Sequence, residues 1–269
     1  MNSGRTGPVS RQPTRRFQAR LGAASRPRRT KDRNAIAPCV PAAFTLVELL
    51  VVIAVMGILA SLLMASLSRS KDKAWQASCR NNLHELGLTF HLYHGDFEDQ
   101  FPGPGSKYEY GPQLEDWIWW QYGRGVGKSA IGKYAGDFNP KLFTCPADRR
   151  AKSLQEKGYL ANEPYRYSYA LTSYDLTNNF NPGLATIITQ ERRVFPFKAH
   201  AIRNPAFKLM LEEEDDKTID DPRWVPVGQQ PNLISPRHGG KGDVAFADGH
   251  VEPVTPQFGQ NLSHSNPGL

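Results

Sequence analysis

The 269-residue sequence lacks the short patterns that usually identify an enzyme. It contains no Gly-x-Ser-x-Gly nucleophile elbow, no His-Glu-x-x-His pair and no two carboxylates at a spacing that supports acid–base chemistry. Residues 123–129 are glycine-rich like a phosphate-binding loop, but they lack its first glycine at the required spacing and follow no apolar strand. We therefore expect no nucleotide binding and no enzymatic activity.

Charge is nearly absent from residues 44–67, which carry one charged side chain, Glu48, in 24 positions. A helix of that length measures roughly 36 Å, which is enough to cross a bilayer. A secretory signal has a shorter apolar core with small residues at a cleavage site after it, whereas here the small residue Ala43 precedes the apolar run. The sequence therefore predicts a membrane-spanning segment at residues 44–67.

Acidic residues are almost missing from residues 1–43, which hold ten Lys or Arg and only Asp32. This stretch accounts for +9 of the net charge of +7, so residues 44–269 carry +7 − 9 = −2. A cluster of Lys and Arg beside a membrane helix is typical of its cytoplasmic flank, which explains the positive net charge of the chain. We therefore expect no nucleic-acid partner. Because residues 1–43 are rich in Arg, Pro, Ser and Gly and have few apolar positions, they predict a disordered leader.

The single charge in the apolar run is part of a longer pattern. A carboxylate at the bilayer centre costs roughly 2.5 to 3.5 kcal/mol, so it usually has a cationic partner. The basic leader, Ala43, the run Phe-Thr-Leu-Val-Glu from Phe44 to Glu48 and the apolar helix resemble the processing site of type IV pilins and type II secretion pseudopilins. This resemblance implies that a prepilin peptidase cuts between Ala43 and Phe44 and methylates the new amine. It also implies that Glu48 pairs with the amine of a neighbouring subunit; an ordinary signal anchor is the alternative.

Proline is absent from residues 45–94, and apolar residues follow a helical spacing in the second half of this stretch. The apolar positions are Trp75, Cys79, Leu83, Leu86, Phe90 and Tyr93. The pattern predicts one helix over residues 45–94, with a membrane half at 44–67 and a half at 68–95 that packs one face on a soluble domain. His84, His91 and His94 also recur at helical steps, where we favour a solvated face over metal ligands.

Cysteine is scarce, with three residues in the whole chain. Cys39 lies in the leader and is lost if cleavage occurs. Cys79 and Cys145 then form an even pair in a domain expected in an oxidising compartment. Since Cys79 lies on the inward helix stripe, a disulfide that ties a loop to the helix is one hypothesis, and two buried thiols are the other.

Residues 96–269 predict a loop-rich C-terminal domain built on an antiparallel sheet. Strand signals lie at residues 165–171, 184–189 and 207–211, without alternating helices that would favour a parallel sheet. The aromatic residues Trp117, Trp119 and Trp120 suit a sugar-binding platform, but a loop packed on its own aromatic side chains is the favoured interpretation.

An acidic run at residues 212–216 follows the last of these strand signals. Glu212, Asp215 and Asp216 could supply oxygen ligands to a calcium ion, although their spacing matches no established calcium loop. The favoured interpretation is a charged surface turn without a cofactor.

Asp248-Gly249 lies between two alternating segments and predicts a hairpin with a type I′ turn. His238, nine further residues and Asp248-Gly249 are similar to a C-terminal motif of a large family of pilin-like proteins of obscure function. The Cys-Arg-Asn-Asn-Leu run at 79–83 and Phe101-Pro102 are similar to the same family's helix-side pattern. A catalytic or metal cluster at this motif is possible, but side chains that fix loop and turn are favoured.

These observations predict an α+β, pilin-like architecture in which a long N-terminal helix packs on a C-terminal antiparallel sheet. The expected function is a structural subunit of a type IV pilus-like or type II secretion filament. Its partners would be a prepilin peptidase, other pilin-like subunits and the bacterial inner membrane, with the leader cytoplasmic and the C-terminal domain periplasmic or extracellular. The alternatives are a pilin-anchored carbohydrate-binding protein and a surface hydrolase.

Overall fold

The computed structural model describes residues 44–105, 113–119, 126–136, 139–148, 167–174, 183–189, 191, 193–228 and 231–269. Two units are distinguished, Met1–Val52 and Ile53–Leu269. The predicted leader, including Ala43, lies outside the described residues, as does Trp120.

Helix α1 (Leu46–Asp96) is 51 residues long and confirms the single helix expected from the proline-free stretch. Its buried positions begin at Cys79 and include Leu83, Leu86 and Phe90, which recur every three or four residues. The helix ends where Glu98 and Asp99 take positive φ angles of 50° and 64°. The apolar stripe in the sequence therefore identifies the face of α1 that meets the rest of its unit.

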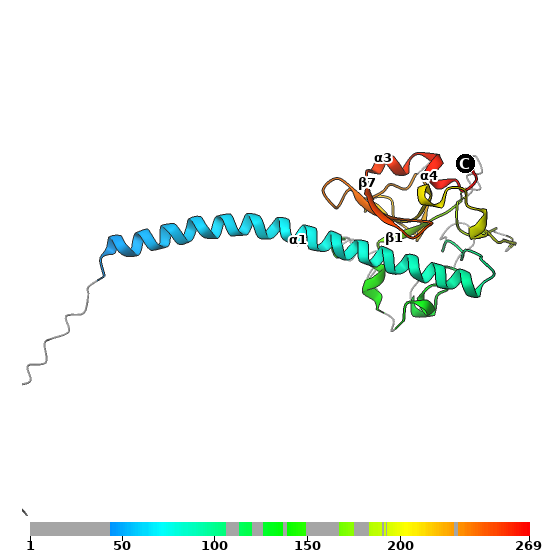
Figure 1. Cartoon of the computed structure of the whole chain (residues 1–269), viewed down its shortest axis with the longest axis horizontal. Helices are drawn as coiled ribbons and strands as arrows, with labels where there is room; N and C mark the ends of the chain where they lie inside the picture. The colour runs from blue at the N-terminus through cyan, green and yellow to red at the C-terminus, as the bar shows by residue number, and fades with distance from the viewer. Residues whose placement is uncertain are drawn as a thin grey trace, which may run out of the picture. The chain divides into compact units, whose positions relative to one another are not determined.

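The main sheet has five strands in the order β5-β1-β4-β6-β7. Its strands are β1 (Tyr169–Thr172), β4 (Leu209–Glu213), β5 (Arg223–Trp224), β6 (Gly242–Phe246) and β7 (Val251–Val254). All neighbours are antiparallel except β1 and β5, which are parallel. The fold is thus α+β with a mostly antiparallel sheet, which lies along the C-terminal part of α1 (Figure 1).

Short elements complete the described part of the chain. A separate antiparallel pair consists of β2 (Ile187–Ile188) and β3 (Val194–Phe195). The short helices are η1 (Val126–Lys128), η2 (Gly132–Tyr134), η3 (Pro140–Phe143), η4 (Ala199–Ala201), η5 (Pro205–Phe207), α3 (Pro256–Gly259) and α4 (Leu262–Ser265).

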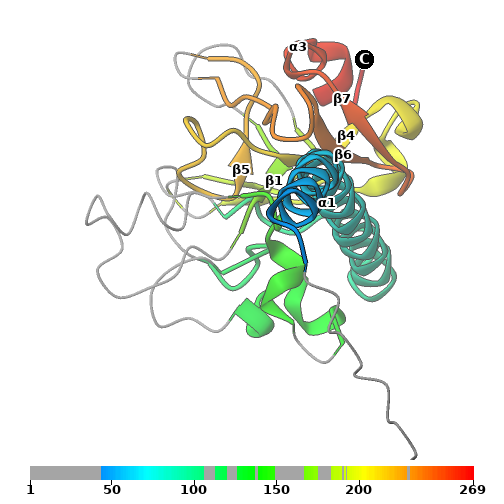
Figure 2. The ribbon, with the colours of Figure 1, turned by 90° about the vertical axis from the view of Figure 1, so that its left-hand side faces the viewer.

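Both faces of the main sheet are buried. Successive residues of a strand point to opposite faces, so neighbouring residues contribute to different cores. Leu171 and Ala245 belong to a core shared with α1, whereas Ala170 and Val244 belong to a second core on the other face. Phe258 of α3 packs against that second core. Helix α1 and helix α3 therefore cover opposite faces of the sheet (Figure 2).

The acidic run forms the expected surface turn only in part, since Glu212, Glu213 and Glu214 are fully buried and the exposed turn begins at Asp216. Glu212 and Glu213 end strand β4, and the Thr172 hydroxyl donates a hydrogen bond to Glu212. Burial raises the pKa of Glu212 well above its ordinary value, so a neutral carboxylic acid is favoured there. The expectation is wrong for these three residues because each carboxyl group accepts at least one hydrogen bond inside the fold, from Thr172, His238 or Asn232.

The hairpin between β6 and β7 is confirmed, but its predicted type I′ turn is wrong. Phe246 and His250 close the loop by a backbone hydrogen bond, which leaves Ala247, Asp248 and Gly249 between them. Asp248 is not among the residues with positive φ, whereas Gly249 has a φ of 93°. This arrangement is typical of a three-residue loop with a glycine at its left-handed position.

The packing of α1 on the sheet predicts unequal effects of two leucines that lie two positions apart on different faces of the helix. Leu86 is fully buried and Leu88 is 55% exposed. We expect Leu86→Ala to lower the free energy of unfolding by about 2 to 5 kcal/mol, because it removes packed methyl groups and leaves a cavity. The matched Leu88→Ala change should stay within about 0.5 kcal/mol. Urea unfolding of the full chain in detergent, followed by tryptophan fluorescence, measures both; equal losses would contradict this packing.

Candidate functional site

The N-terminus of α1 is closed by Thr45 and Glu48. The Thr45 hydroxyl accepts a hydrogen bond from the Glu48 backbone N–H at 3.2 Å. In return, the Glu48 carboxylate accepts hydrogen bonds from the Thr45 N–H at 2.8 Å and from the Thr45 hydroxyl at 2.7 Å. This reciprocal pair is a capping box, which satisfies N–H groups that the first turn of a helix leaves free. Glu48 therefore has a structural partner within its own chain.

The first part of α1 exposes apolar side chains in every direction. Four successive residues, which together cover all sides of a helix, are between 42% and 57% exposed: Leu49, Leu50, Val51 and Val52. The helix is long and apolar enough to cross a membrane, and none of its most apolar stretch is buried by the described residues. An apolar surface of this kind requires lipid or other apolar helices around it.

A second candidate site lies buried between α1 and the sheet. A disulfide joins Cys79 of α1 to Cys145, with 5.1 Å between their Cα atoms. His238 Nε2 lies 3.4 Å from the Cys145 sulfur and 3.1 Å from Glu213 Oε1. Because a disulfide sulfur carries no hydrogen, a hydrogen bond between it and His238 needs the ring proton on Nε2. The His238 and Glu213 side chains are 2% and 0% exposed, so these contacts are shielded from water.

Residues next to the disulfide hold α1 against the domain. Arg80 Nε forms an ion pair with Asp243 at 3.0 Å, and Asp243 in turn donates its backbone N–H to Glu213 at 2.9 Å. The Asn82 amide donates to the backbone carbonyls of Lys141 and Thr144, just before Cys145. The Cys-Arg-Asn-Asn-Leu run is therefore a contact segment between the helix and the sheet domain.

The two halves of the His-x9-Asp-Gly motif lie in different environments. His238 belongs to the buried cluster, whereas Asp248 accepts hydrogen bonds from the backbone and ring of His250 at the hairpin tip. Burial alone would raise the pKa of Asp248, but the bonds from His250 bring it below its ordinary value. In the described part of the chain no hydrogen bond or ion pair joins His238 to Asp248.

Gly249 fits the hairpin tip closely against α1. A Cβ atom at Gly249 would lie 3.2 Å from His91 Nε2, and one at Gly87 would lie 3.9 Å from the Gly249 Cα. The positive φ of Gly249 adds a second reason for glycine at this position. The motif thus holds the ends of strand β6 to the helix, which agrees with the interpretation that its side chains fix loop and turn.

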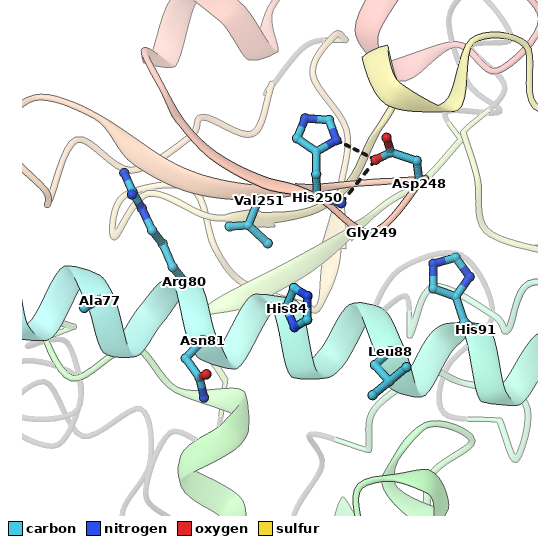
Figure 3. A pocket seen from close by; sticks show the side chains of 10 residues that line it. All are labelled: Ala77, Arg80, Asn81, His84, Leu88, His91, Asp248, Gly249, His250 and Val251. Carbon is cyan, nitrogen blue, oxygen red and sulfur yellow. Dashed lines mark hydrogen bonds and ion pairs between the residues drawn. The ribbon is translucent and has the colours of Figure 1, made fainter.

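Beside the hairpin tip, an open cleft of about 750 Å³ lies between α1 and the hairpin. Figure 3 shows Arg80, His84 and His91 along the helix on one side of this cleft and the paired Asp248 and His250 on the other. The cleft therefore offers histidine and arginine hydrogen-bond donors to a ligand.

The proposed calcium ligands are not brought together. Glu212 is buried beside Thr172, Asp215 accepts a hydrogen bond from the backbone of Lys217, and Asp216 pairs with Arg237 at 2.8 Å. Among the described residues, the grouping of potential metal ligands is a different one, formed by Cys79, Cys145, Glu213 and His238. The structure thus gives no support to a calcium site at the acidic run.

The tryptophans do not form an exposed platform. Trp117 is fully buried in the core shared with α1, and its indole N–H donates to the carbonyl of Pro222 at 3.0 Å. Trp119 is half-buried and donates to the carbonyl of Gln113. A buried Trp117 supports the interpretation of a loop packed on its own aromatic side chains, and it removes one of the three tryptophans from a sugar-stacking surface.

The chain matches no known protein family model, and no curated protein and no solved structure shows significant similarity to it.

Two contacts of these sites were missed by the sequence interpretation. The Thr45-x-x-Glu48 spacing is a capping-box signal, but the family resemblance drew attention to the charge of Glu48 alone. Glu213 was grouped with its acidic neighbours, and no local pattern connects it with His238, which lies 25 positions later. A pairing of this kind depends on the sheet register and carries no signal in the sequence.

His94, at the end of the buried helix face, predicts a pH dependence of stability. The side chain is buried, not solvated as expected, and its Nε2 has no hydrogen-bond partner among the described residues. Burial, with a smaller contribution from His91, lowers the pKa of His94 from 6.5 to about 4. The folded state therefore keeps His94 neutral while the unfolded chain takes up a proton below pH 6.5.

We expect the stability contributed by neutral His94 to be present above pH 6.5 and to be lost progressively as the pH falls to about 4. The loss should amount to about 2 to 3 kcal/mol in wild type and should be absent in His94→Leu. Unfolding free energies of both proteins at pH 7 and pH 4.5 measure the difference. Parallel pH profiles would show that His94 titrates as freely in the folded state as in the unfolded chain.

Proposed function

We propose that the protein is the precursor of a structural subunit of a type IV pilus-like or type II secretion filament. A prepilin peptidase of the bacterial inner membrane cuts between Ala43 and Phe44 and methylates the Phe44 amine. The processed chains then assemble through their N-terminal helices, with the C-terminal domain outside the cytoplasm. The observation that supports this most directly is the uncovered apolar half of α1 with Glu48 in its first turn.

The uncovered surface favours assembly because it can be buried in two successive environments. Lipid covers it in the precursor, and the helices of sister subunits cover it in a filament. Gly57 has nothing within 4 Å of a Cβ position, so a neighbouring helix has room to approach there. The sheet domain can fold outside the membrane, because its two cores, as far as the structure describes them, contain no residue from the apolar half of α1.

Glu48 has two roles in this proposal. In the precursor it caps the helix through Thr45, and that bond uses one carboxylate oxygen, Oε2. After cleavage the Phe44 amine becomes a positive charge at the same end of the helix, and the other oxygen of Glu48 can pair with the amine of a neighbouring chain. Pairing lowers the free-energy cost of a carboxylate at the edge of an apolar bundle. Because the pair forms only where Glu48 of one chain meets the amine of the next, it favours one axial position of the two helices relative to each other.

The rival functions have less support from the described residues. A sugar-binding platform loses one of its three tryptophans because Trp117 is buried. A hydrolase built on His238 and Asp248 would need both in one site, yet they belong to separate clusters.

Three variants separate the charge of Glu48 from its capping role. Glu48→Gln keeps a capping side chain but removes the charge, Glu48→Ala removes both, and Thr45→Val removes the capping hydroxyl but keeps the charge. We expect both Glu48 variants to lose filament assembly. Thr45→Val should still assemble, at a cost of about 1 kcal/mol in helix stability. Filaments sheared from the producing cells and quantified by immunoblot measure assembly.

Carbonate extraction of membranes provides the control for insertion, because all three variants should remain in the membrane. All three should also be cleaved. Wild-type assembly by Glu48→Gln, together with failure of Thr45→Val, would assign Glu48 to helix capping alone and reject the charge-pairing role.

A further inference from the structure

The buried cluster at the disulfide brings together four side chains that commonly bind metals. Cys79, Cys145, Glu213 and His238 each offer one ligand atom, and these atoms all lie within 4.8 Å of one another. They come from helix α1, the segment after η3, strand β4 and the loop before β6. The cluster therefore links the helix to the sheet from four separate points in the sequence.

We propose that these four side chains bind one zinc ion when the Cys79–Cys145 disulfide is reduced. Two thiolates, an imidazole nitrogen and a carboxylate oxygen are the donor types that Zn²⁺ takes in tetrahedral sites, whereas calcium and magnesium prefer oxygen alone. The site has no position left for water, which is the arrangement of a structural metal. Zinc would thus replace the disulfide as the link between α1 and the sheet.

The chemistry of the exchange balances. A dithiol reductant gives two electrons and two protons to the disulfide sulfurs and is itself oxidised to a disulfide. Zinc then displaces the two thiol protons to solvent. Before it binds zinc, His238 loses its Nε2 proton to solvent and takes up a proton at Nδ1, so that the Nε2 lone pair faces the metal. The disulfide and the metal site exclude each other, because the same two sulfur atoms form both.

The surroundings of the cluster support a built ligand set. The Asp243 backbone N–H fixes Glu213 through its Oε2 at 2.9 Å, which leaves Oε1 toward His238. Cys145 is held by a hydrogen bond from its backbone N–H to the Ser168 hydroxyl at 3.0 Å. Partners of this kind orient metal ligands and maintain their geometry.

An unsatisfied carboxylate oxygen points to the same place. Asp243 Oδ2 is buried without a hydrogen-bond partner in the described part of the chain, and it lies 3.9 Å from His238 Nε2. A buried carboxylate oxygen is costly without compensating charge, and Arg80 contacts only the other oxygen. A divalent cation beside His238 would supply that charge.

The experiment uses the full chain with Cys39→Ser, so that only the two cysteines of the cluster contribute thiols. Production in cells that cannot form periplasmic disulfides gives the reduced chain without a refolding step, and ordinary cells give the oxidised chain. We expect metal analysis of the purified proteins to find one zinc per reduced chain and none per oxidised chain. Cobalt added in place of zinc should give a thiolate charge-transfer absorption that Cys145→Ser weakens, because only one thiolate remains.

Matched variants identify the ligands. His238→Gln and Glu213→Gln should each weaken zinc binding at least about 100-fold, because each removes a ligand of the metal. His250→Gln changes a histidine at the exposed hairpin tip and should leave zinc binding unchanged. A folded reduced chain that binds no zinc when zinc is supplied, a reduced chain that stays unfolded with zinc present, or zinc binding that His238→Gln leaves unchanged would each overturn the proposal. None of these outcomes bears on filament assembly, which is tested separately at Glu48.

Discussion

An apolar helical surface that nothing in the described chain covers is the constraint on which the other features depend. Burial of a leucine or valine side chain contributes about 1.5 to 3 kcal/mol, so a stretch with all its sides exposed is strongly driven toward lipid or other helices. The sheet domain does not supply that cover, because its two cores contain, among the described residues, none from the apolar half of the helix. The chain therefore combines a self-sufficient domain with a helix that needs an external environment, and the proposed filament provides one.

The junction between helix and sheet has to keep these two parts together. Cys79 and Arg80 fix α1 from the helix side, while His238 and Gly249 approach it from the two ends of the segment that contains β6. Covalent, ionic and close-packed contacts thus converge on about three turns of helix. In the proposed filament the subunit is held by its helix, so any force along α1 would reach the sheet through these contacts.

Local patterns in the sequence predicted the elements that depend mainly on residues close together in the chain. The proline-free run and its stripe gave α1, and Asp248-Gly249 gave the hairpin. The short strands β3 and β5 were not predicted, because two residues carry no periodicity and their pairing depends on neighbours far along the chain. For the same reason the first three residues of the acidic run were wrongly placed on the surface: hydrogen bonds to Glu213 from His238 and Asp243 exist only once the sheet has formed. The role of Glu48 as a cap was readable from Thr45 three positions earlier.

The mass of the intact protein isolated from its native membrane tests the central claim most directly. If the apolar helix serves filament assembly, the chain lacks its 43 leader residues, begins at Phe44 and carries one added methyl group. A mature protein that retains the basic leader, or that is cut anywhere other than between Ala43 and Phe44, would contradict the proposed function.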